Sequence, residues 1–414
     1  MRFAFASIGS LGDLHPILAM AVAAARRGHD VVVAAALGYE ENVARAGFEF
    51  YALRPDIPQD PGSLAYFFDM KRGAGRLLRD MVFAHVAETH EDLCRVARGA
   101  DLLVVGELLY TALIVAEAEG IPWLNVVLAP TSMLSASDPC VLAPAPWLHK
   151  FRNLGPWLHH LAYCFGRLQG RMWTSGYYRF RRSLGLPPGA DPIFEAKHSP
   201  FGTLAMFPDF FAAPQRDWPR GTVQAGFPFY HQGGGVESVQ AFLTKGSPPV
   251  VFTLGSIVAH FEPSFYHAAA EAAQILGRRA ILLTGRNTAV PQNLPDSLLA
   301  VNYAPLHSIL PEACAIIHAG GIGTCAEALR AGLPSVVIPF AFDQPDNAAR
   351  LQRLGVAEIL SRKSISATNL ASKLERLLKT PTASHAASRL ADRIDPQKAL
   401  DKALDKMEST VIKA

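Results

Sequence analysis

Two series of short apolar segments alternate with segments of helix length, and this alternation constrains the fold more than any other feature. The first series is a strand at Arg2–Ser7, a Gly-rich turn, a helix over residues 16–27 and a second apolar strand at 30–37. Strands joined by crossovers of helix length lie parallel in one sheet. Further strands are expected at 100–105 and 123–127, and a second series at 249–256, 280–284, 315–318 and 336–339. The pattern predicts an α/β protein with two doubly wound, Rossmann-like domains.

A chain of 414 residues is too long for one ordinary hydrophobic core, which agrees with two domains. Residues 207–226 are rich in Pro and Gly and form the candidate linker. We expect domains at residues 1–220 and 221–385, and a polar helical tail at 386–414 that crosses back to the first domain. Ligands of such sheets bind outside the carboxyl ends of the strands. The two domains should therefore face each other across a ligand cleft.

The composition excludes several classes of protein. Half of the residues are hydrophobic and 18% are charged, as in globular domains. A formal net charge of +3 is too small to indicate a nucleic-acid partner. The longest apolar run is interrupted by Gly106, Glu107 and Glu117 and falls short of the roughly 18 residues of a membrane span. These features predict a cytoplasmic protein.

The segment that starts at His318 has the order of features that an anion site needs. His318 ends an apolar run, and Gly320, Gly321 and Gly323 let the backbone turn sharply and let a ligand come close. A helix predicted over 324–331 would point free N–H groups and a partial positive charge at this turn. A bound phosphate that accepts from the histidine is one interpretation, and a purely structural glycine turn is the other.

Asp343 and Gln344 follow the next predicted strand and reach the same edge of the sheet. Their side chains carry the acceptors and donors that sugar hydroxyls need. Such a pair in a loop is usually solvated surface. Here it follows the glycine turn with a helix stop between them, and the combination predicts a nucleotide-sugar site.

A sugar transferase also needs a base for the acceptor hydroxyl and charge stabilisation for the leaving diphosphate. Gly12-Asp13-Leu14-His15-Pro16 lies between the first strand and the first helix, so we expect Asp13 to project into the cleft as that base. The alternative for Asp13 is an N-cap of the first helix. His15 is the rival base, or else a histidine packed at the helix start.

These motifs resemble one family. Tyr303-Ala304-Pro305-Leu306, His318-Ala319-Gly320-Gly321 and Asp343-Gln344 are similar to the donor signature of the glycosyltransferases that include plant and animal UDP-glycosyltransferases, sterol glucosyltransferases and glycopeptide-antibiotic transferases. Gly12-Asp13-Leu14-His15-Pro16 is similar to the catalytic turn of many bacterial members. The resemblance implies the GT-B fold, an N-terminal acceptor-binding domain, a C-terminal nucleotide-sugar-binding domain and an inverting reaction.

The resemblance also implies roles for single residues. Tyr303 is expected to stack on the nucleobase beside Ala304, unless it is an ordinary core tyrosine. Glu327 is expected to reach the ribose hydroxyls. Four further residues are expected to hold phosphate oxygens, namely Gly323, Thr324, Gly255 and Ser256.

We expect the negative charge of the leaving diphosphate to be stabilised without a metal ion. The sequence contains no Asp-x-Asp pair, which metal-dependent sugar transferases usually need. A helix N-terminus and His318 would do this work, and neither a metal nor a cofactor is expected. Glu107, just past the strand Leu102–Val105, resembles the family residue that orients the catalytic base.

A second set of segments narrows the resemblance. Residues 207–219, 226–228 and 251–256 are similar to the rhamnosyltransferases of bacterial rhamnolipid synthesis. This likeness implies dTDP-L-rhamnose as donor and a hydroxy-fatty acid as acceptor. The alternatives are a glucosyltransferase that uses UDP- or dTDP-glucose on a natural-product or sterol-like aglycone, a sugar-nucleotide 2-epimerase, and a sugar-nucleotide-binding protein without transferase activity.

Residues 139–190 contain no Asp or Glu and are rich in Arg and Trp. Basic and aromatic side chains on helices suit an anionic lipid or a membrane surface. A packed helical insertion with a solvated basic face explains the same composition. The first interpretation predicts a hydrophobic or amphipathic acceptor and a peripheral association with the inner membrane surface.

Overall fold

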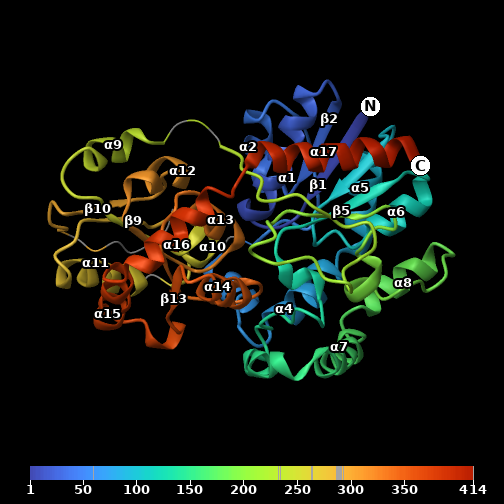
Figure 1. Ribbon diagram of the computed structural model, residues 1–414. Coiled ribbons are helices and arrows are strands. Elements are labelled where there is room, and N and C mark those ends of the chain that lie inside the picture. The colour runs from blue at the N-terminus through green and yellow to red at the C-terminus, as the bar shows by residue number, and fades with distance from the viewer. Residues whose placement is uncertain are drawn as a thin grey trace.

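The structure is a computed structural model that describes residues 1–58, 60–231, 233, 235–262, 264–285, 291 and 293–413. Two α/β units lie side by side, and each is built on its own parallel sheet (Figure 1). The predicted fold class of two doubly wound, Rossmann-like domains is confirmed.

The first sheet has seven parallel strands in the order β3-β2-β1-β4-β5-β6-β7. β1 pairs with both β2 and β4, so the strand order reverses at β1. Ligands of open α/β sheets bind at such a reversal. The strands are β1 (Arg2–Ser7), β2 (Asp30–Ala35), β3 (Glu49–Ala52), β4 (Leu102–Val105), β5 (Trp123–Val127), β6 (Thr203–Ala205) and β7 (Val223–Gln224).

Alternation along β1 buries both faces of this sheet. Phe3 and Phe5 pack with Leu14 of α1, whereas Ala4 and Ala6 belong to the cluster on the side of α5 and α6. Apolar residues at every position of a strand are typical of a sheet covered on both sides. The helices of this unit are α1 (Leu11–Arg26), α2 (Glu40–Arg45), α3 (Pro61–Phe67), α4 (Gly73–Arg76), α5 (Val86–Ala97), α6 (Ala112–Glu119), α7 (Pro156–Gly170) and α8 (Ser175–Ser183).

The second sheet has six parallel strands in the order β10-β9-β8-β11-β12-β13. Its strands are β8 (Val250–Thr253), β9 (Ala280–Leu283), β10 (Leu298–Val301), β11 (Ala315–His318), β12 (Ser335–Val337) and β13 (Ala357–Ile359). The helices are α9 (Glu237–Leu243), α10 (Gly255–Val258), α11 (Ser264–Ile275), α12 (Leu306–Ile309), α13 (Ile322–Arg330), α14 (Gln344–Arg353), α15 (Ala367–Leu378) and α16 (Pro381–Ala391).

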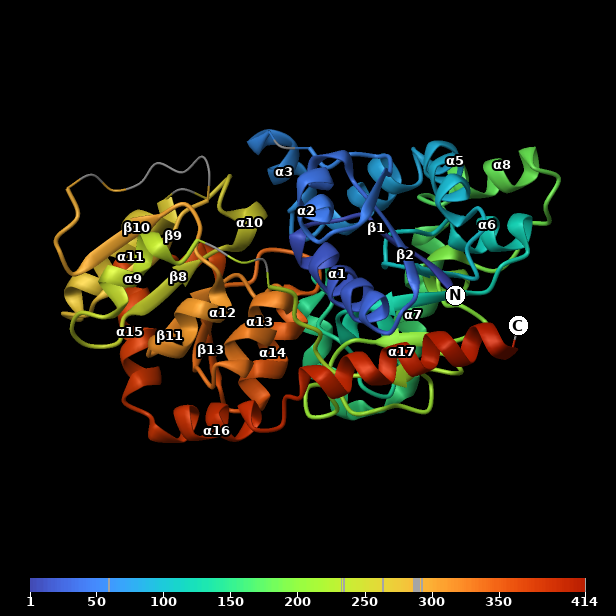
Figure 2. The same ribbon diagram turned by 90° about the horizontal axis from the view of Figure 1, so that it is seen from above.

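The last helix, α17 (Pro396–Lys413), lies across the first unit (Figure 2). Leu404 and Met407 are buried in the same apolar cluster as Leu14. Arg27, at the end of α1, forms ion pairs with Asp401 at 2.8 Å and with Asp405 at 2.7 Å. The end of the chain therefore packs on α1, while the expected domain limits at 220 and 385 stay a prediction.

The helix expected over 16–27 begins at Leu11, so this prediction is wrong at its start. Ser10 is the N-cap and its Oγ accepts from the Gly12 N–H at 3.1 Å. Asp13 completes a capping box by accepting from the Ser10 N–H at 2.6 Å. Pro16 lies inside the helix, where it costs one hydrogen bond, to the Gly12 carbonyl. Among the described residues, no helix has both the length and the apolar character needed to cross a bilayer.

Candidate functional site

Three carboxylates from distant parts of the chain come together where the two units meet. Asp13 lies in the first turn of α1, Glu107 follows β4, and Asp343 directly precedes α14 in the second unit. Burial, together with the negative charges of Glu107 and Asp13, raises the pKa of Asp343 to about 7, although the hydrogen bond from Asn347 lowers it. The three groups therefore share one electrostatic environment, and predicted residues of both units contribute to it.

Asp13 is held by the turn that carries it. Its Oδ2 accepts hydrogen bonds from the Ser10 backbone N–H at 2.6 Å and from the Ser10 hydroxyl at 2.9 Å. Gly9 permits this approach, because a Cβ there would lie 2.4 Å from Asp13 Oδ2. Asp13 is thus the third residue of the helix and not its N-cap. Its Oδ1 takes no part in the capping box and is left for another partner.

The pKa of Asp13 suits a general base. Burial raises it to about 6, although both hydrogen bonds from Ser10 lower it, and the charge of Glu107 adds to the rise. Such a carboxylate is largely ionised near neutral pH and still binds a proton better than an ordinary Asp.

His15, the rival base, lies two residues further along α1 and points away from Asp13. The centroid of its ring lies 5.7 Å from that of Tyr230. Burial lowers the pKa of His15 to about 4, which makes the neutral imidazole a weak base. The geometry favours Asp13.

Both oxygens of Glu107 are engaged within the first unit. Oε1 accepts from the Leu128 N–H at 2.7 Å, and Oε2 accepts from the Ser132 hydroxyl. Lys197 Nζ donates to the Ser132 carbonyl at 2.8 Å, which ties the same loop from its other side. Glu107 organises the loop after β5 and contributes negative charge to Asp13. Its expected role in orienting the base stays a prediction.

His318 ends β11 and is fully buried. Its Nδ1 accepts from the Gly320 N–H at 3.1 Å, so the proton of the neutral ring sits on Nε2. Burial lowers the pKa of His318 to about 3, which keeps the ring neutral. Nε2 is buried and has no hydrogen-bond partner in the described part of the chain. A buried donor of this kind is costly unless a bound group accepts from it.

The glycine turn after His318 is shaped by close packing on one side only. Gly320 has a φ of 90°, and a Cβ there would lie 2.8 Å from Val337 Cγ1. A Cβ at Gly321 or Gly323 would meet no atom within 4 Å. α13 begins at Ile322, two residues before the predicted start at Thr324, because Gly321 serves as its N-cap. The backbone of its first turn, which includes Thr324, borders open space and can receive an anion.

Gly255 and Ser256 start the short helix α10 after β8. Gly255 has a φ of 79°, and its N–H donates to Thr253 Oγ1 at 3.1 Å. This N–H already has a partner within the protein. Ser256 is exposed and can still reach a ligand.

Tyr303 is 59% exposed, so it is not an ordinary core tyrosine. Ala304 beside it is buried, which leaves only its backbone for a ligand. Glu327 lies one turn into α13, and its Oε2 accepts from Arg330 Nη2 at 2.8 Å. Tyr303 therefore offers a ring face for stacking, whereas Glu327 is already paired on one oxygen.

The acidic–amide pair at the start of α14 is only partly free. Asp343 Oδ2 accepts from Asn347 Nδ2 at 2.7 Å, and the same amide donates to the Gly320 carbonyl at 2.9 Å. Gln344 Oε1 accepts from two backbone N–H groups of the preceding loop at 2.8 and 3.1 Å. Asn347, which the sequence motifs did not indicate, links Asp343 to the glycine turn. The acceptor of Gln344 is used internally, and its NH₂ group is what remains for a sugar.

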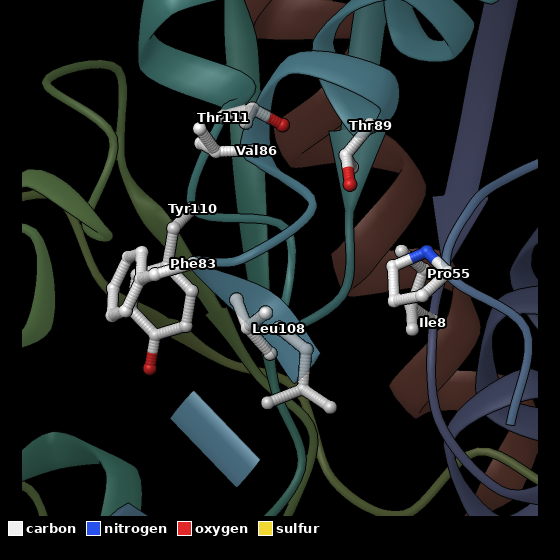
Figure 3. Close-up of a pocket in the computed structure, with 9 residues that line it drawn as sticks. Ile8, Pro55, Phe83, Val86, Thr89, Leu108, Tyr110 and Thr111 are labelled. Atoms are coloured by element: carbon white, nitrogen blue, oxygen red, sulfur yellow. The ribbon is translucent and has the colours of Figure 1, made fainter. Parts of the chain in front are cut away.

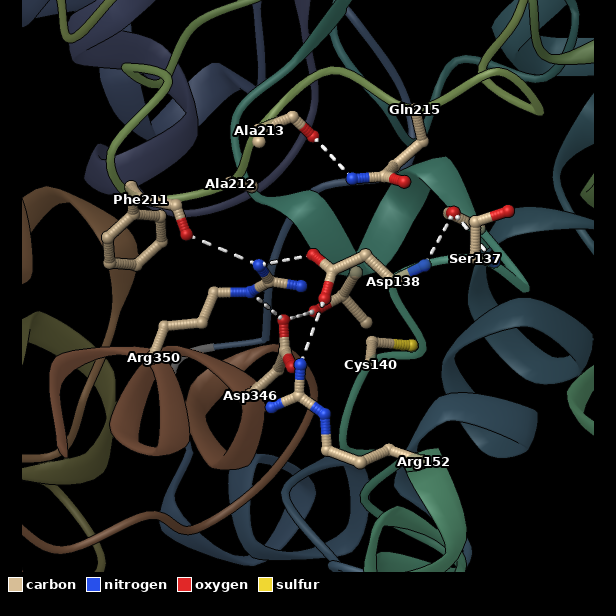
Figure 4. Close-up of polar contacts among 12 residues, drawn as sticks. Ser137, Asp138, Cys140, Arg152, Phe211, Ala212, Ala213, Gln215, Asp346 and Arg350 are labelled. Carbon is tan, nitrogen blue, oxygen red and sulfur yellow. Dashed lines mark hydrogen bonds and ion pairs between the residues drawn. The ribbon is translucent and has the colours of Figure 1, made fainter. Parts of the chain in front are cut away.

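A buried arginine joins α14 to the first unit (Figure 4). Arg350 Nε donates to Asp346 Oδ2 at 2.7 Å, and its Nη1 donates to Asp138 Oδ2 at 2.7 Å. Asp346 Oδ1 also accepts from the Val141 N–H at 2.9 Å. The side chains of Arg350 and Asp346 are 2% and 0% exposed. This cluster fixes the helix that begins beside Asp343 against the loop that follows Ser132. The only sign of this cluster in the sequence is the i, i+4 spacing of Asp346 and Arg350, which is typical of an ion pair on a helix.

A small apolar pocket lies within the first unit (Figure 3). Its internal volume is about 10 Å³, which is room for roughly one water molecule. Leu108 directly follows Glu107, and the rings of Phe83 and Tyr110 lie 5.1 Å apart, centroid to centroid. An apolar group could extend this pocket only by displacing side chains. The lining residues are Ile8, Pro55, Val82, Phe83, Val86, Thr89, Leu108, Tyr110 and Thr111.

The chain is similar to known proteins over nearly its whole length. Residues 3–136 match the glycosyltransferase family 28 N-terminal domain, and residues 270–400 match the erythromycin biosynthesis protein CIII-like C-terminal domain. The O-mycaminosyltylonolide 6-deoxyallosyltransferase of Streptomyces fradiae is 30% identical, over 97% of this chain and 96% of its own length.

Solved structures show the same architecture. The glycotransferase of kitacinnamycin has a TM-score of 0.72 at 20% identity and is matched over 99% of both chains. The spinosyn rhamnosyltransferase SpnG, complexed with thymidine diphosphate, has a TM-score of 0.69 at 20% identity, over 98% of this chain and 100% of that one. These likenesses agree with two parallel-sheet units facing each other.

Proposed function

This chain belongs to the glycosyltransferases that combine a family 28 N-terminal domain with an erythromycin-CIII-like C-terminal domain, and from that membership we propose its specific reaction. The enzyme moves a 6-deoxy sugar, with L-rhamnose as the favoured case, from a dTDP donor to a hydroxyl of an amphipathic acceptor. The proposal rests above all on one observation. His318 ends β11 just before the N-terminus of α13, and its buried Nε2 has no hydrogen-bond partner among the described residues, as a diphosphate site requires.

The proposed mechanism is a single displacement. Asp13 takes the proton of the acceptor hydroxyl as that oxygen forms a bond to the anomeric carbon of the sugar. The bond between this carbon and the diphosphate oxygen breaks, and one displacement inverts the configuration. The diphosphate lies at the N-terminus of α13, where His318 Nε2 donates to it. Asp343 and the Gln344 amide hold the sugar hydroxyls, and Tyr303 stacks on the base.

The donor assignment is supported by the names of related proteins. The Streptomyces fradiae relative is a 6-deoxyallosyltransferase, and the structurally similar SpnG is a rhamnosyltransferase that was solved with thymidine diphosphate. The first name favours a 6-deoxy sugar, and the second favours a rhamnosyl group carried by thymidine diphosphate. The resemblance of residues 207–219 to rhamnosyltransferases is the further support for rhamnose.

For the acceptor we propose a hydroxy-fatty acid, and a natural-product aglycone is the second candidate. The first candidate is supported by the resemblance of residues 207–219 to the rhamnolipid rhamnosyltransferases. The second candidate is favoured by the relative that acts on O-mycaminosyltylonolide. The alternative of a binding protein without transferase activity is set aside by the family membership.

The direct test combines a panel of donors with a panel of acceptors. The purified enzyme is incubated with dTDP-L-rhamnose, dTDP-glucose or UDP-glucose, each with a 3-hydroxy-fatty acid or a macrolide aglycone, and products are identified by mass. A rhamnosylated fatty acid supports the proposal in full. If only glucose is transferred, the proposed donor is wrong. If only the aglycone accepts a sugar, the proposed acceptor is wrong.

His318→Ala is expected to weaken the binding of dTDP by about tenfold and to change that of thymidine little, because the lost Nε2–H bonds a charged diphosphate. Titration calorimetry with both ligands measures the two affinities. His159→Ala is the matched control, since His159 is also buried with both ring nitrogens unpartnered among the described residues, yet it lies on α7. Equal losses for dTDP and thymidine in His318→Ala would move His318 out of the diphosphate site.

Chelation by EDTA is expected to leave turnover unchanged. The sequence lacks an Asp-x-Asp pair, and the proposed diphosphate site consists of a helix N-terminus and a neutral imidazole. Initial rates are compared with and without the chelator, and again after addition of Mg²⁺ or Mn²⁺. Loss of turnover that either ion restores would require a metal in the mechanism.

A further inference from the structure

The helix α7 turns an apolar face outward. Leu154, just before the helix, and Met172, just after it, continue a row along α7 with the spacing of one helix face. The six side chains of this row are between 58% and 69% exposed. We call them the α7 apolar face; they are Leu154, Trp157, Leu161, Phe165, Leu168 and Met172.

The opposite side of α7 holds the helix to the protein, so the orientation is fixed. His159 and Tyr163 are buried on that side, and the Tyr163 hydroxyl donates to the Ser135 carbonyl at 3.2 Å. A Cβ at Gly170 would lie 3.3 Å from Ile193 Cδ1, which shows how closely this side packs. α7 lies at the edge of the first unit, at the bottom of Figure 1. Monomeric proteins rarely expose so continuous an apolar row without a partner for it.

The charge around this face identifies the partner. Residues 139–190 contain no acidic side chain. Of the acidic groups that flank the stretch, Glu195 pairs with Arg167 at 2.6 Å and Asp138 with Arg350 at 2.7 Å, while Asp191 accepts from two backbone N–H groups. Four basic side chains are exposed and form no ion pair with any described residue, namely Lys150, Arg171, Arg179 and Arg182. This combination fits a partner surface that takes up apolar side chains and also carries negative charge.

We propose that the α7 apolar face docks the enzyme on an anionic lipid membrane, with the helix lying in the membrane surface. The apolar side chains enter the boundary between head groups and acyl chains, and the basic side chains contact the anionic head groups. The buried side of α7 contacts the loop whose Ser132 bonds Glu107. Docking therefore places the acceptor side of the active site next to the lipid phase. This consequence rests on the proposed function, but the docking itself does not depend on it.

The test is sedimentation of the whole enzyme with vesicles of phosphatidylglycerol and phosphatidylethanolamine, and with vesicles of phosphatidylcholine alone. We expect binding to the anionic vesicles that weakens with salt, and much less binding to the neutral ones. Trp157→Ser combined with Phe165→Ser should lower the binding by about tenfold or more, because binding scales with the apolar area inserted. Arg171→Gln combined with Arg179→Gln should lower it only for anionic vesicles. Ile275→Ser is the control, since Ile275 is 61% exposed on α11 of the other unit.

Three outcomes would overturn the proposal. One is an absence of vesicle binding by the folded wild-type enzyme. Another is binding that Trp157→Ser with Phe165→Ser leaves intact. The third is a dimer in sedimentation velocity that this double variant dissociates while no vesicle binds, which would assign the face to a second copy of the chain. None of these outcomes depends on transferase activity, so failure here is distinguishable from failure of the proposed function.

Discussion

Asp13→Asn is expected to lower turnover by about 10²–10⁴-fold, the range that a general base contributes. Asn keeps the shape of the side chain, and its amide oxygen can still accept from the Ser10 N–H as Asp13 Oδ2 does at 2.6 Å. What Asn loses is the ability to take a proton at Oδ1. The affinity for dTDP should stay close to the wild-type value, because the diphosphate site belongs to the second unit. Turnover and dTDP affinity are measured on the same folded preparation.

The pH dependence should change with the same substitution. Asp13 and Asp343 have pKa values raised to about 6 and about 7, so turnover of the wild type should fall as pH decreases through this range. The two groups interact, so the fall in turnover on the acidic side of the pH profile reports the titration of the pair and not of one residue. The residual activity of Asp13→Asn should no longer show the part of this acidic fall in turnover that comes from protonation of Asp13.

The free energy of unfolding should depend on pH in the opposite direction to turnover. Both folded-state pKa values lie above the unfolded value, so the folded protein binds these protons more tightly. The stabilisation from these two groups is fully present below about pH 4 and is lost as pH rises through about 6 to 7.

Loss of the capping box could imitate part of the Asp13 effect through stability. Asp395→Asn is the matched control, because the Asp395 carboxylate also accepts from a backbone N–H at a helix start, that of Lys398 at 2.9 Å, in α17. It should change stability little, because Asn caps a helix about as well as Asp, and it should leave turnover unchanged. Wild-type turnover in a folded Asp13→Asn enzyme would remove Asp13 from the mechanism and return His15 to consideration.

The sequence predicted the sheets well where strands are apolar throughout. β1, β5 and β11 lie where their apolar runs placed them. All four edge strands, β3, β7, β10 and β13, were missed, as was the three-residue strand β6. Partly exposed residues in an edge strand weaken the continuous apolar run that marks a buried strand. The start of α1 was also missed, although Ser10-Leu11-Gly12-Asp13 has the spacing of a capping box.

The candidate site was predictable where the chain itself determines the geometry. The order of strand, glycine turn and helix places His318 beside the N-terminus of α13, and local sequence alone sets this. The internal use of the Gln344 oxygen was not predictable, because its partners depend on how the preceding loop folds. Contacts between the units were not predictable either, since Asp138 and Arg350 are 212 residues apart in the chain.

Arg350→Ala is expected to lower the free energy of unfolding by about 3–5 kcal/mol, the cost of leaving a buried charge without its partner. Asp346 is 0% exposed and would lose the guanidinium that lies 2.7 Å from its Oδ2. The Val141 N–H and the Thr131 hydroxyl would remain as donors, and these two neutral groups do not balance a buried negative charge. Asp138 would lose its 2.7 Å partner in the same step, which removes the ion pair that joins α14 to the first unit. Urea unfolding followed by fluorescence measures the loss.

The ion pair between Arg45 and Glu41 provides the control, because it has the same i, i+4 spacing but side chains that are 58% and 75% exposed. Arg45→Ala should cost less than about 1 kcal/mol, since water screens an exposed pair. Asp346→Asn added to Arg350→Ala should restore part of the loss, because it removes the charge that the first substitution leaves unpaired. If Arg350→Ala costs no more than Arg45→Ala, the cluster does not hold the two units together. The position of Asp343 opposite Asp13 would then depend on other contacts, such as the hydrogen bonds of Asn347 to Asp343 and to the Gly320 carbonyl.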